Sequence, residues 1–167
     1  MNKKLLFSAL AGIVSVVFLI NSFVRFIPID PSLGQIFLYV SLAAYISYVY
    51  GFVTLGEKFN VKTLKYLGYV WIACAVVGAL SQLVSTGDLM NAFVSAVFSI
   101  QSALIVILGW TMLQMKEKMG TLAVLYGVCA ILAGSAIPFI FGGLISMGIN
   151  TLCYLFAIPL FVMSAKK

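Results

Sequence analysis

The sequence predicts an all-α, polytopic membrane protein: a single domain over residues 1–167, built as a bundle of six transmembrane helices with both termini in the cytoplasm. Three observations lead to this prediction. The chain is 63% hydrophobic and only 8% charged, which leaves a soluble domain too little polar surface to present to water. The charged residues fall outside the apolar segments. The lysines form four clusters, and each of the three stretches between them is long enough to cross a bilayer twice.

Six apolar segments cover most of the chain. A bilayer core about 30 Å thick needs about 20 helical residues, and lipid offers no partner to an unpaired backbone, so each segment is expected to be a helix. The apolar runs are too long for barrel strands and do not alternate. Pro138 and the pair Gly142-Gly143 separate the last two helices, because proline stops a helix and glycine permits a tight reversal. The predicted helices cover residues 5–24, 35–54, 65–85, 91–114, 120–138 and 143–163.

The cationic residues predict the orientation. Arg25 is the one cation on the side opposite the termini. The nine others are Lys3, Lys4, Lys58, Lys62, Lys65, Lys116, Lys118, Lys166 and Lys167. The positive-inside rule therefore places both ends in the cytoplasm, and six spans return the chain to that side. We expect a multi-pass protein of the cell membrane, of the prokaryotic plasma-membrane type. Its net charge of +6 sits in short loops beside apolar spans, which predicts contact with membrane lipids and no nucleic-acid partner.

Aromatic residues near the ends of the predicted helices are expected to anchor at headgroup depth, where amphipathic rings are favoured. They are Phe26, Tyr39, Tyr50, Phe52, Tyr66, Tyr69, Trp71 and Trp110.

A cytoplasmic turn motif recurs along the chain. The segment Glu57-Lys58-Phe59 precedes Thr63-Leu64, and Glu117-Lys118-Met119 precedes Thr121-Leu122. Three repeated helical hairpins in one orientation would give this pattern, as parallel repeats do in some transporters. The alternative is a chance likeness, because apolar helices resemble one another in composition.

Small residues predict seams for helix packing. Spaced about one helical turn apart, they let two backbones approach closely, which is how helices associate in lipid. The alternative, a conduction path lined by small residues, is less favoured. The predicted seam residues are Ala123, Gly127, Ala130 and Gly134 in the fifth helix and Ala75 and Ala79 in the third.

Polar side chains within or beside the predicted spans form a candidate ligand cleft, mostly in the outer half of the membrane. An amide left unsatisfied in hydrocarbon costs several kcal/mol, so Gln101 and Asn150 are expected to face a partner or water. Two interpretations stay open: interhelical hydrogen bonds, worth about 0.6 kcal/mol each, or an outward-facing cleft that binds a small polar or amphiphilic molecule. The candidate residues are Gln101, Asn150, Ser99, Ser102, Ser95, Gln82, Asn21, Arg25 and Tyr45.

The composition excludes most enzyme chemistry. The sequence has no histidine, which removes His-ligated metals and haem and the Ser–His form of proteolysis. Its four carboxylates fall in loops or at interfaces, so no buried acid pair is available. The three cysteines are widely spaced and form no CxxC motif, which predicts neither a disulfide nor a metal site. We therefore expect no enzymatic activity, no metal and no cofactor.

Two functions fit these observations. The first, which the sequence favours, is a structural or accessory membrane subunit that packs against other subunits, or against a second copy, through small-residue seams. The second is a transport-class protein that binds or passes a small solute or lipid through the outward-facing polar cleft.

The size and the six-helix, termini-inside layout resemble the substrate-binding subunits of energy-coupling-factor vitamin importers. Those subunits tend to carry an Ala-x-x-x-Ala seam on the first helix for their coupling partner. Here the first helix offers Ala9 and Ala11, a spacing that does not match. The tight turn predicted between the fifth and sixth helices also leaves little loop to close over a ligand. The resemblance is therefore one of architecture alone.

Overall fold

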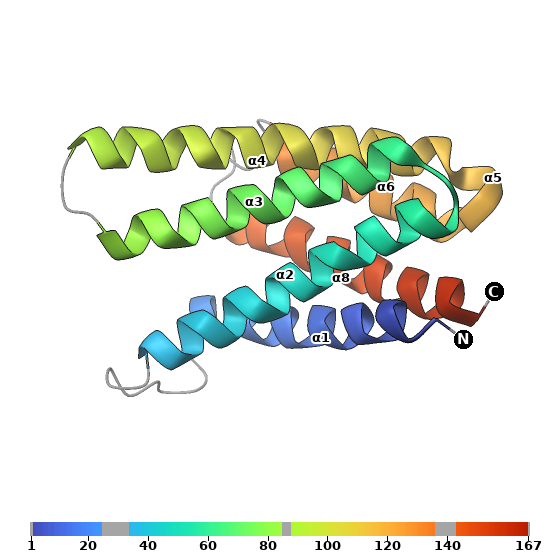
Figure 1. The fold of residues 1–167 in the computed structure, drawn as a ribbon, viewed down its shortest axis with the longest axis horizontal. Helices are drawn as coiled ribbons and strands as arrows, with labels where there is room; N and C mark the ends of the chain where they lie inside the picture. The colour runs from blue at the N-terminus through green and yellow to red at the C-terminus, as the bar shows by residue number, and fades with distance from the viewer. Residues whose placement is uncertain (1, 25–33, 85–87, 136–142, 167) are drawn as a thin grey trace.

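Five long helices form most of the structure, a computed structural model that describes residues 2–24, 34–84, 88–135 and 143–166 (Figure 1). They contain 22 to 27 residues each, and all five are long and apolar enough to cross a membrane. Within the described residues the secondary structure is helical, with no strand. The five helices are α1 (Lys3–Val24), α2 (Gly34–Lys58), α3 (Lys62–Val84), α4 (Asp88–Gln114) and α8 (Gly143–Lys166).

Each long helix overlaps a predicted range and extends beyond it at one end or both. The extension is largest at α2, which continues from the predicted end at residue 54 to Lys58. A helix satisfies its own backbone hydrogen bonds, so it continues into its polar flanks instead of ending with its apolar residues.

The region of the predicted fifth helix differs from the prediction. A short helix that was not predicted, α5 (Lys116–Met119), follows α4 and is separated from α6 (Thr121–Gly134) by Gly120. Gly120 has φ of 78°, a left-handed conformation that glycine adopts without steric cost. With 14 residues, α6 is about 21 Å long at 1.5 Å per residue. The rest of the predicted span and its turn, residues 136–142, lies outside the described residues.

The helices form a closed ring in chain order. Each helix packs against the next one: α1 against α2, α2 against α3, α3 against α4, α4 against α6, and α6 against α8. The ring closes because α8 packs against α1. The two ends of the chain meet at one end of this ring, where the Asn2 N–H donates a hydrogen bond to the Ala165 carbonyl oxygen at 2.9 Å (Figure 1). The α2–α3 turn and the short helix α5 lie at this same end.

A cluster of aromatic rings fills the centre of the ring. Phe52 on α2 is fully buried, and its ring centroid lies 5.0 Å from that of Tyr126 on α6 and 5.0 Å from that of Phe161 on α8. Trp71 on α3 stacks on Phe52 at 6.2 Å and is only 5% exposed. The prediction that Phe52 and Trp71 anchor at the membrane interface is therefore wrong. Both residues lie near a helix end, as an interfacial anchor would, but their side chains are on the helix face that points into the core.

The predicted seam on α6 packs within the chain. A Cβ built on Gly127 would lie 2.7 Å from the Gly109 carbonyl oxygen of α4, and one built on Gly134 would lie 2.5 Å from the Ser102 carbonyl oxygen. Ala123 and Ala130 are fully buried. Glycine thus allows two backbones to come closer than any side chain would permit, and it does so between α4 and α6.

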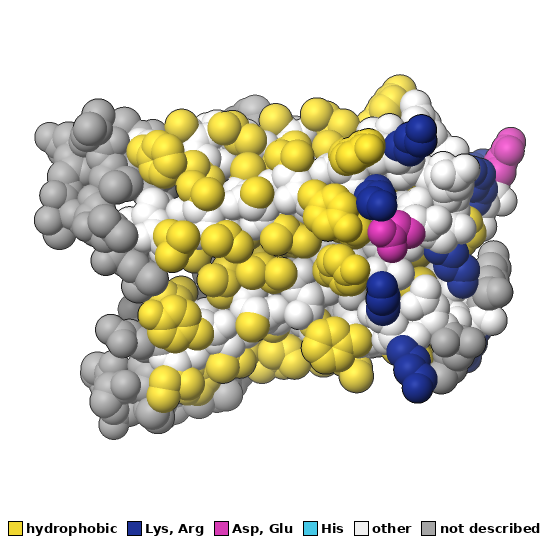
Figure 2. All heavy atoms as spheres, viewed as in Figure 1, with side chains coloured by type: hydrophobic (Ala, Val, Ile, Leu, Met, Phe, Trp, Pro, Cys, Tyr) yellow, Lys and Arg dark blue, Asp and Glu magenta, His cyan; other side chains and the backbone are white. Residues whose placement is uncertain are grey.

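The outer surface is apolar along its length and cationic at one end. Figure 2 shows hydrophobic side chains spread over the face in view and lysines gathered at one end of it. Large apolar side chains such as Phe7, Leu10, Ile36 and Leu80 are more than half exposed. Soluble monomers rarely expose extensive apolar surface. Together with the five long apolar helices, this surface indicates a multi-pass membrane protein.

The cationic end is held by contacts between its turns. Lys58 Nζ donates a hydrogen bond to the Ser164 carbonyl oxygen in the last turn of α8, where a cation favours the helix dipole. Lys65 Nζ forms an ion pair with Glu57 Oε1 at 3.1 Å across the α2–α3 turn.

We expect Gly127→Val to destabilise the bundle by about 1–3 kcal/mol, because a larger side chain forces α4 and α6 apart. Gly148→Val in α8 is the matched control, since no described atom lies within 4 Å of a Cβ built there. Thermal denaturation of the two purified variants in mild detergent measures the difference. Equal stability of the two variants would contradict the close α4–α6 contact.

Candidate binding pocket

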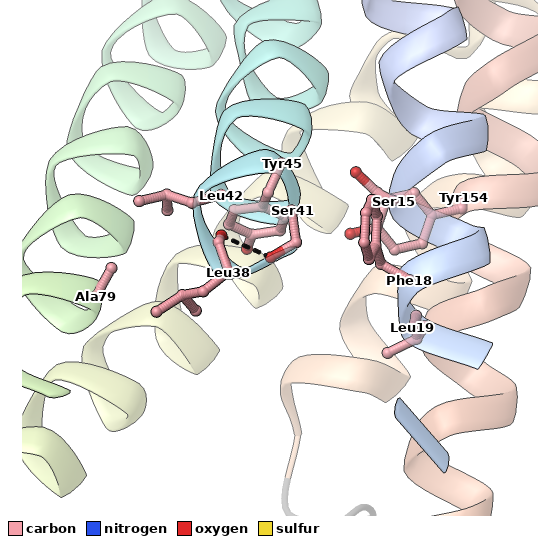
Figure 3. Close-up of a pocket in the computed structure, with 9 residues that line it drawn as sticks. All are labelled: Ser15, Phe18, Leu19, Leu38, Ser41, Leu42, Tyr45, Ala79 and Tyr154. Carbon is pink, nitrogen blue, oxygen red and sulfur yellow. Dashed lines mark hydrogen bonds between the residues drawn. The ribbon is translucent and has the colours of Figure 1, made fainter. Parts of the chain in front are cut away.

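An open pocket of about 330 Å³ lies between α2 and the pair α1–α8, with α3 at its edge (Figure 3). On α1 it is lined by residues past the middle of the helix, and on α2 by residues of its first half. The pocket therefore lies in the half of the bundle away from the lysines. The lining residues are Ser15, Phe18, Leu19, Leu38, Ser41, Leu42, Tyr45, Ala79 and Tyr154.

Small side chains create this space. Ser15 on α1, Ser41 on α2 and Ala79 on α3 line the pocket with short side chains. On one side of the pocket the Phe18 and Phe37 rings meet edge to face, with centroids 5.7 Å apart, and tie α1 to α2. The helices α1 and α2 are thus in contact beside the pocket, while the pocket itself is not filled by side chains.

The serine hydroxyls of the pocket are bonded to their own helices. Ser15 Oγ donates to the Ala11 carbonyl oxygen at 3.0 Å, and Ser41 Oγ donates to the Leu38 carbonyl oxygen at 2.8 Å (Figure 3). Each hydroxyl therefore keeps its lone pairs for another partner. The wall is apolar, with a few polar atoms that can orient a molecule.

A second, inner cavity of about 50 Å³ lies next to the pocket, towards the core. Tyr45 and Tyr154 line both spaces and so form the boundary between them. The lining residues of the inner cavity are Tyr45, Tyr48, Trp71, Ile105, Tyr126, Asn150, Cys153 and Tyr154. Among the described residues that line the two spaces, none is charged.

Tyr45 and Asn150, two of the nine predicted cleft residues, lie together in these cavities. Ser95 and Ser99 are instead exposed on the outer face of α4, where Ser99 Oγ donates to the Ser95 carbonyl oxygen at 2.9 Å. Gln101 and Ser102 are partly exposed and line neither cavity. The helix α4 presents Ile105 to the inner cavity, and Ser99 lies about 120° away around the helix.

Three predicted cleft residues cannot be assigned to the pocket. The side chains of Asn21 and Gln82, and all of Arg25, lie outside the part of the chain that the structure describes.

Sequence reasoning missed Trp71, Ser41 and Tyr154 as cavity residues. Trp71 was assigned to the membrane interface because it lies near a helix end, and Tyr154 lies in a uniformly apolar helix. The available signal was chemical: a tyrosine hydroxyl or indole N–H inside a span needs a polar partner, so such residues tend to share one site.

The second predicted seam behaves differently from the first. Ala75 on α3 is buried, whereas Ala79 lines the open pocket one turn further along. Of the two residues predicted for the α3 seam, one is therefore in the packed core and the other is in the pocket wall.

The residues of the two cavities offer groups that can bind a molecule. Hydroxyls, an amide and an indole can orient a molecule, but among the lining residues described no carboxylate can act as a general base near neutral pH. Within the described residues no group of three His, Cys, Asp or Glu side chains could hold a metal ion.

No protein-family model, curated protein or solved structure matches this chain, so its geometry is the basis for assigning a function.

We expect a cysteine at position 15 to react with N-ethylmaleimide at least about tenfold faster than one at position 8, because reaction requires access to the thiol. Ser8 and Ser15 lie two turns apart on α1 and are 1% and 7% exposed, but only Ser15 lines the pocket. The variants Ser8→Cys and Ser15→Cys are made without the three native cysteines, and mass spectrometry measures the labelling rates. Equal rates would show that the pocket is not accessible.

Proposed function

We propose that this protein is a non-enzymatic, multi-pass membrane protein that binds a small amphiphilic molecule or lipid in the pocket between α2 and the pair α1–α8. The observation that carries this proposal is the pocket itself: about 330 Å³, apolar walls and a few converging hydroxyls. Ligand sites have volumes of about 300–1,000 Å³ and this same mixture of lining groups.

The pocket is open to the surroundings of the bundle, so a lipid or another amphiphile can enter it from the membrane. Elsewhere in this chain the backbones of α4 and α6 approach as closely as glycine allows. A bundle able to pack that tightly yet open between α1, α2 and α8 supports binding over simple scaffolding.

The membrane arrangement is part of the proposal. We propose six spans with both termini in the cytoplasm of the cell, in a plasma membrane of the prokaryotic type. The adjacency of the chain ends and the lysines gathered at that end support this orientation through the positive-inside rule. With α6 as a shorter fifth span, the chain crosses six times. In the proposed orientation the pocket lies in the outer half of the membrane. Three repeated hairpins stay part of the proposal, and the recurring turn motifs Glu57-Lys58 and Glu117-Lys118 are their support.

Binding is tested by purifying the protein in mild detergent and identifying bound small molecules by mass spectrometry. We expect a stoichiometric amphiphile that is lost from Ala79→Phe, because the larger ring fills the pocket. Ala73→Phe is the control, since Ala73 is exposed on the same helix. If no molecule co-purifies with the wild-type chain, or if both variants keep it, the proposed pocket function fails.

An accessory role remains the second candidate, and one surface favours it. Ser95, Ser99 and Ala103 are exposed at i, i+4 and i+8 on α4, which is the small-xxx-small pattern of helices that associate in membranes. The α6 seam cannot serve this purpose because its residues already pack against α4 within the chain.

In the same purification, an accessory role predicts a reproducible protein partner, or a second copy of this chain. That partner is expected to dissociate from Ser99→Leu, whose bulk blocks close approach, and to stay with Ala79→Phe. The subunit composition of the two samples, compared by mass spectrometry, measures the outcome. A partner that survives Ser99→Leu would remove α4 as the contact surface.

A further inference from the structure

Among the described residues, the inner cavity contains a buried donor without an acceptor in hydrogen-bond geometry. Trp71 lines the cavity and is 5% exposed, and its indole Nε1–H has no hydrogen-bond partner within the described part of the chain. The Tyr45 hydroxyl is a polar neighbour of the indole, and the two rings meet edge to face with centroids 6.1 Å apart, but the hydroxyl does not reach hydrogen-bond geometry. A buried N–H without an acceptor costs free energy comparable to a lost hydrogen bond.

The location of this donor suggests a use for it. Ser8 Oγ is also buried without a partner among the described residues, but it lies where α1 packs on Gly51 and lines neither cavity. Trp71 differs because its side chain borders a space of about 50 Å³. Since one water occupies about 30 Å³ in the liquid, this space suits one small polar group.

The lining residues restrict the chemistry of that group. An indole offers a donor and no acceptor, so its partner must present a lone pair. None of the described lining residues is charged, so a phosphate, carboxylate or ammonium group would be buried without a counter-charge, which is strongly unfavourable. Asn150 lines the same space with an amide that can donate as well as accept. These groups match a neutral oxygen acceptor such as a carbonyl.

The two spaces together match one amphiphile. The outer pocket is apolar and open, and it shares Tyr45 and Tyr154 with the inner cavity. A chain or ring in the outer pocket would point its polar end between these two tyrosines, towards Trp71.

We propose that the inner cavity is the polar subsite of the pocket and that it takes the neutral carbonyl oxygen of an uncharged amphiphile, with the Trp71 N–H as the donor. This inference rests on the proposed function and deepens it, since it states the ligand class. The apolar body of that molecule occupies the outer pocket.

The test compares two probes of the same chain length on the detergent-purified protein: 2-dodecanone, which has a carbonyl, and dodecane, which has none. Apparent affinities come from the rise in unfolding temperature with probe concentration, because a ligand that binds the folded state stabilises it. We expect 2-dodecanone to bind about tenfold more tightly, which is the upper range for one neutral hydrogen bond.

Two tryptophan variants test whether the preference for the ketone depends on Trp71. Trp71→Phe is expected to remove the preference for the ketone, whereas the control Trp110→Phe is expected to keep it, since Trp110 is 61% exposed on α4. In Trp110→Phe, Trp71 is the only tryptophan left, and its fluorescence is expected to change with 2-dodecanone and not with dodecane. This measurement and the wild-type comparison hold even if Trp71→Phe fails to fold.

The outcomes separate this inference from the proposed function. If both probes bind equally and Ala79→Phe blocks both, the proposed pocket function is supported and the polar subsite is contradicted. A water molecule that stays bound to the Trp71 N–H would give this result. If the ketone preference survives Trp71→Phe, the inference also fails. If neither probe binds the wild-type chain, the proposed function fails as well.

Discussion

The absence of water from a bilayer core is the constraint on which this structure depends. Backbone groups must be satisfied within each segment, which makes every span a helix, and helices in lipid must associate without a hydrophobic driving force. Close contact supplies that association here. The carbonyl oxygen of Gly109 packs against Gly127, and Phe52 brings α2, α3, α6 and α8 together through aromatic contacts. The charged residues are left at the ends, where they mark one face of the membrane.

One side of the helix ring is tightly packed, and another side contains the open pocket. Between α4 and α6 there is no room for a Cβ at Gly127 or Gly134, so that side is closed. Between α1, α2 and α8 the small side chains Ser15 and Ser41 leave a space of about 330 Å³. Small residues therefore have opposite effects in one molecule. Where two backbones come together they make a seam, and where larger neighbours hold the helices apart they make a pocket.

The sequence was enough to predict the five long helices because lipid solvation depends on composition over long runs, which can be read directly. Position around each helix was harder to predict, since every face of these segments is apolar. Phe52 and Trp71 illustrate the difficulty: they lie at the depth of interfacial anchors yet point inwards. Likewise, Ser99 shares the polar character of Asn150 but lies on the outer face of α4, while Asn150 lines the inner cavity. Among the predicted cleft residues whose side chains the structure describes, only Tyr45 and Asn150 line the cavities, because packing between helices decides which helix faces meet. The same is true of α5, whose separation from α6 depends on the conformation of Gly120.

The direction of the bundle in the membrane decides from which side the pocket can be reached. The direct measurement places a single added cysteine at either end of a cysteine-free chain and treats intact cells, and then inverted membrane vesicles, with a membrane-impermeant maleimide. We predict that both ends are protected in intact cells and labelled in inverted vesicles, because the proposed orientation places the lysine-bearing end in the cytoplasm. Labelling of either end in intact cells would contradict the account.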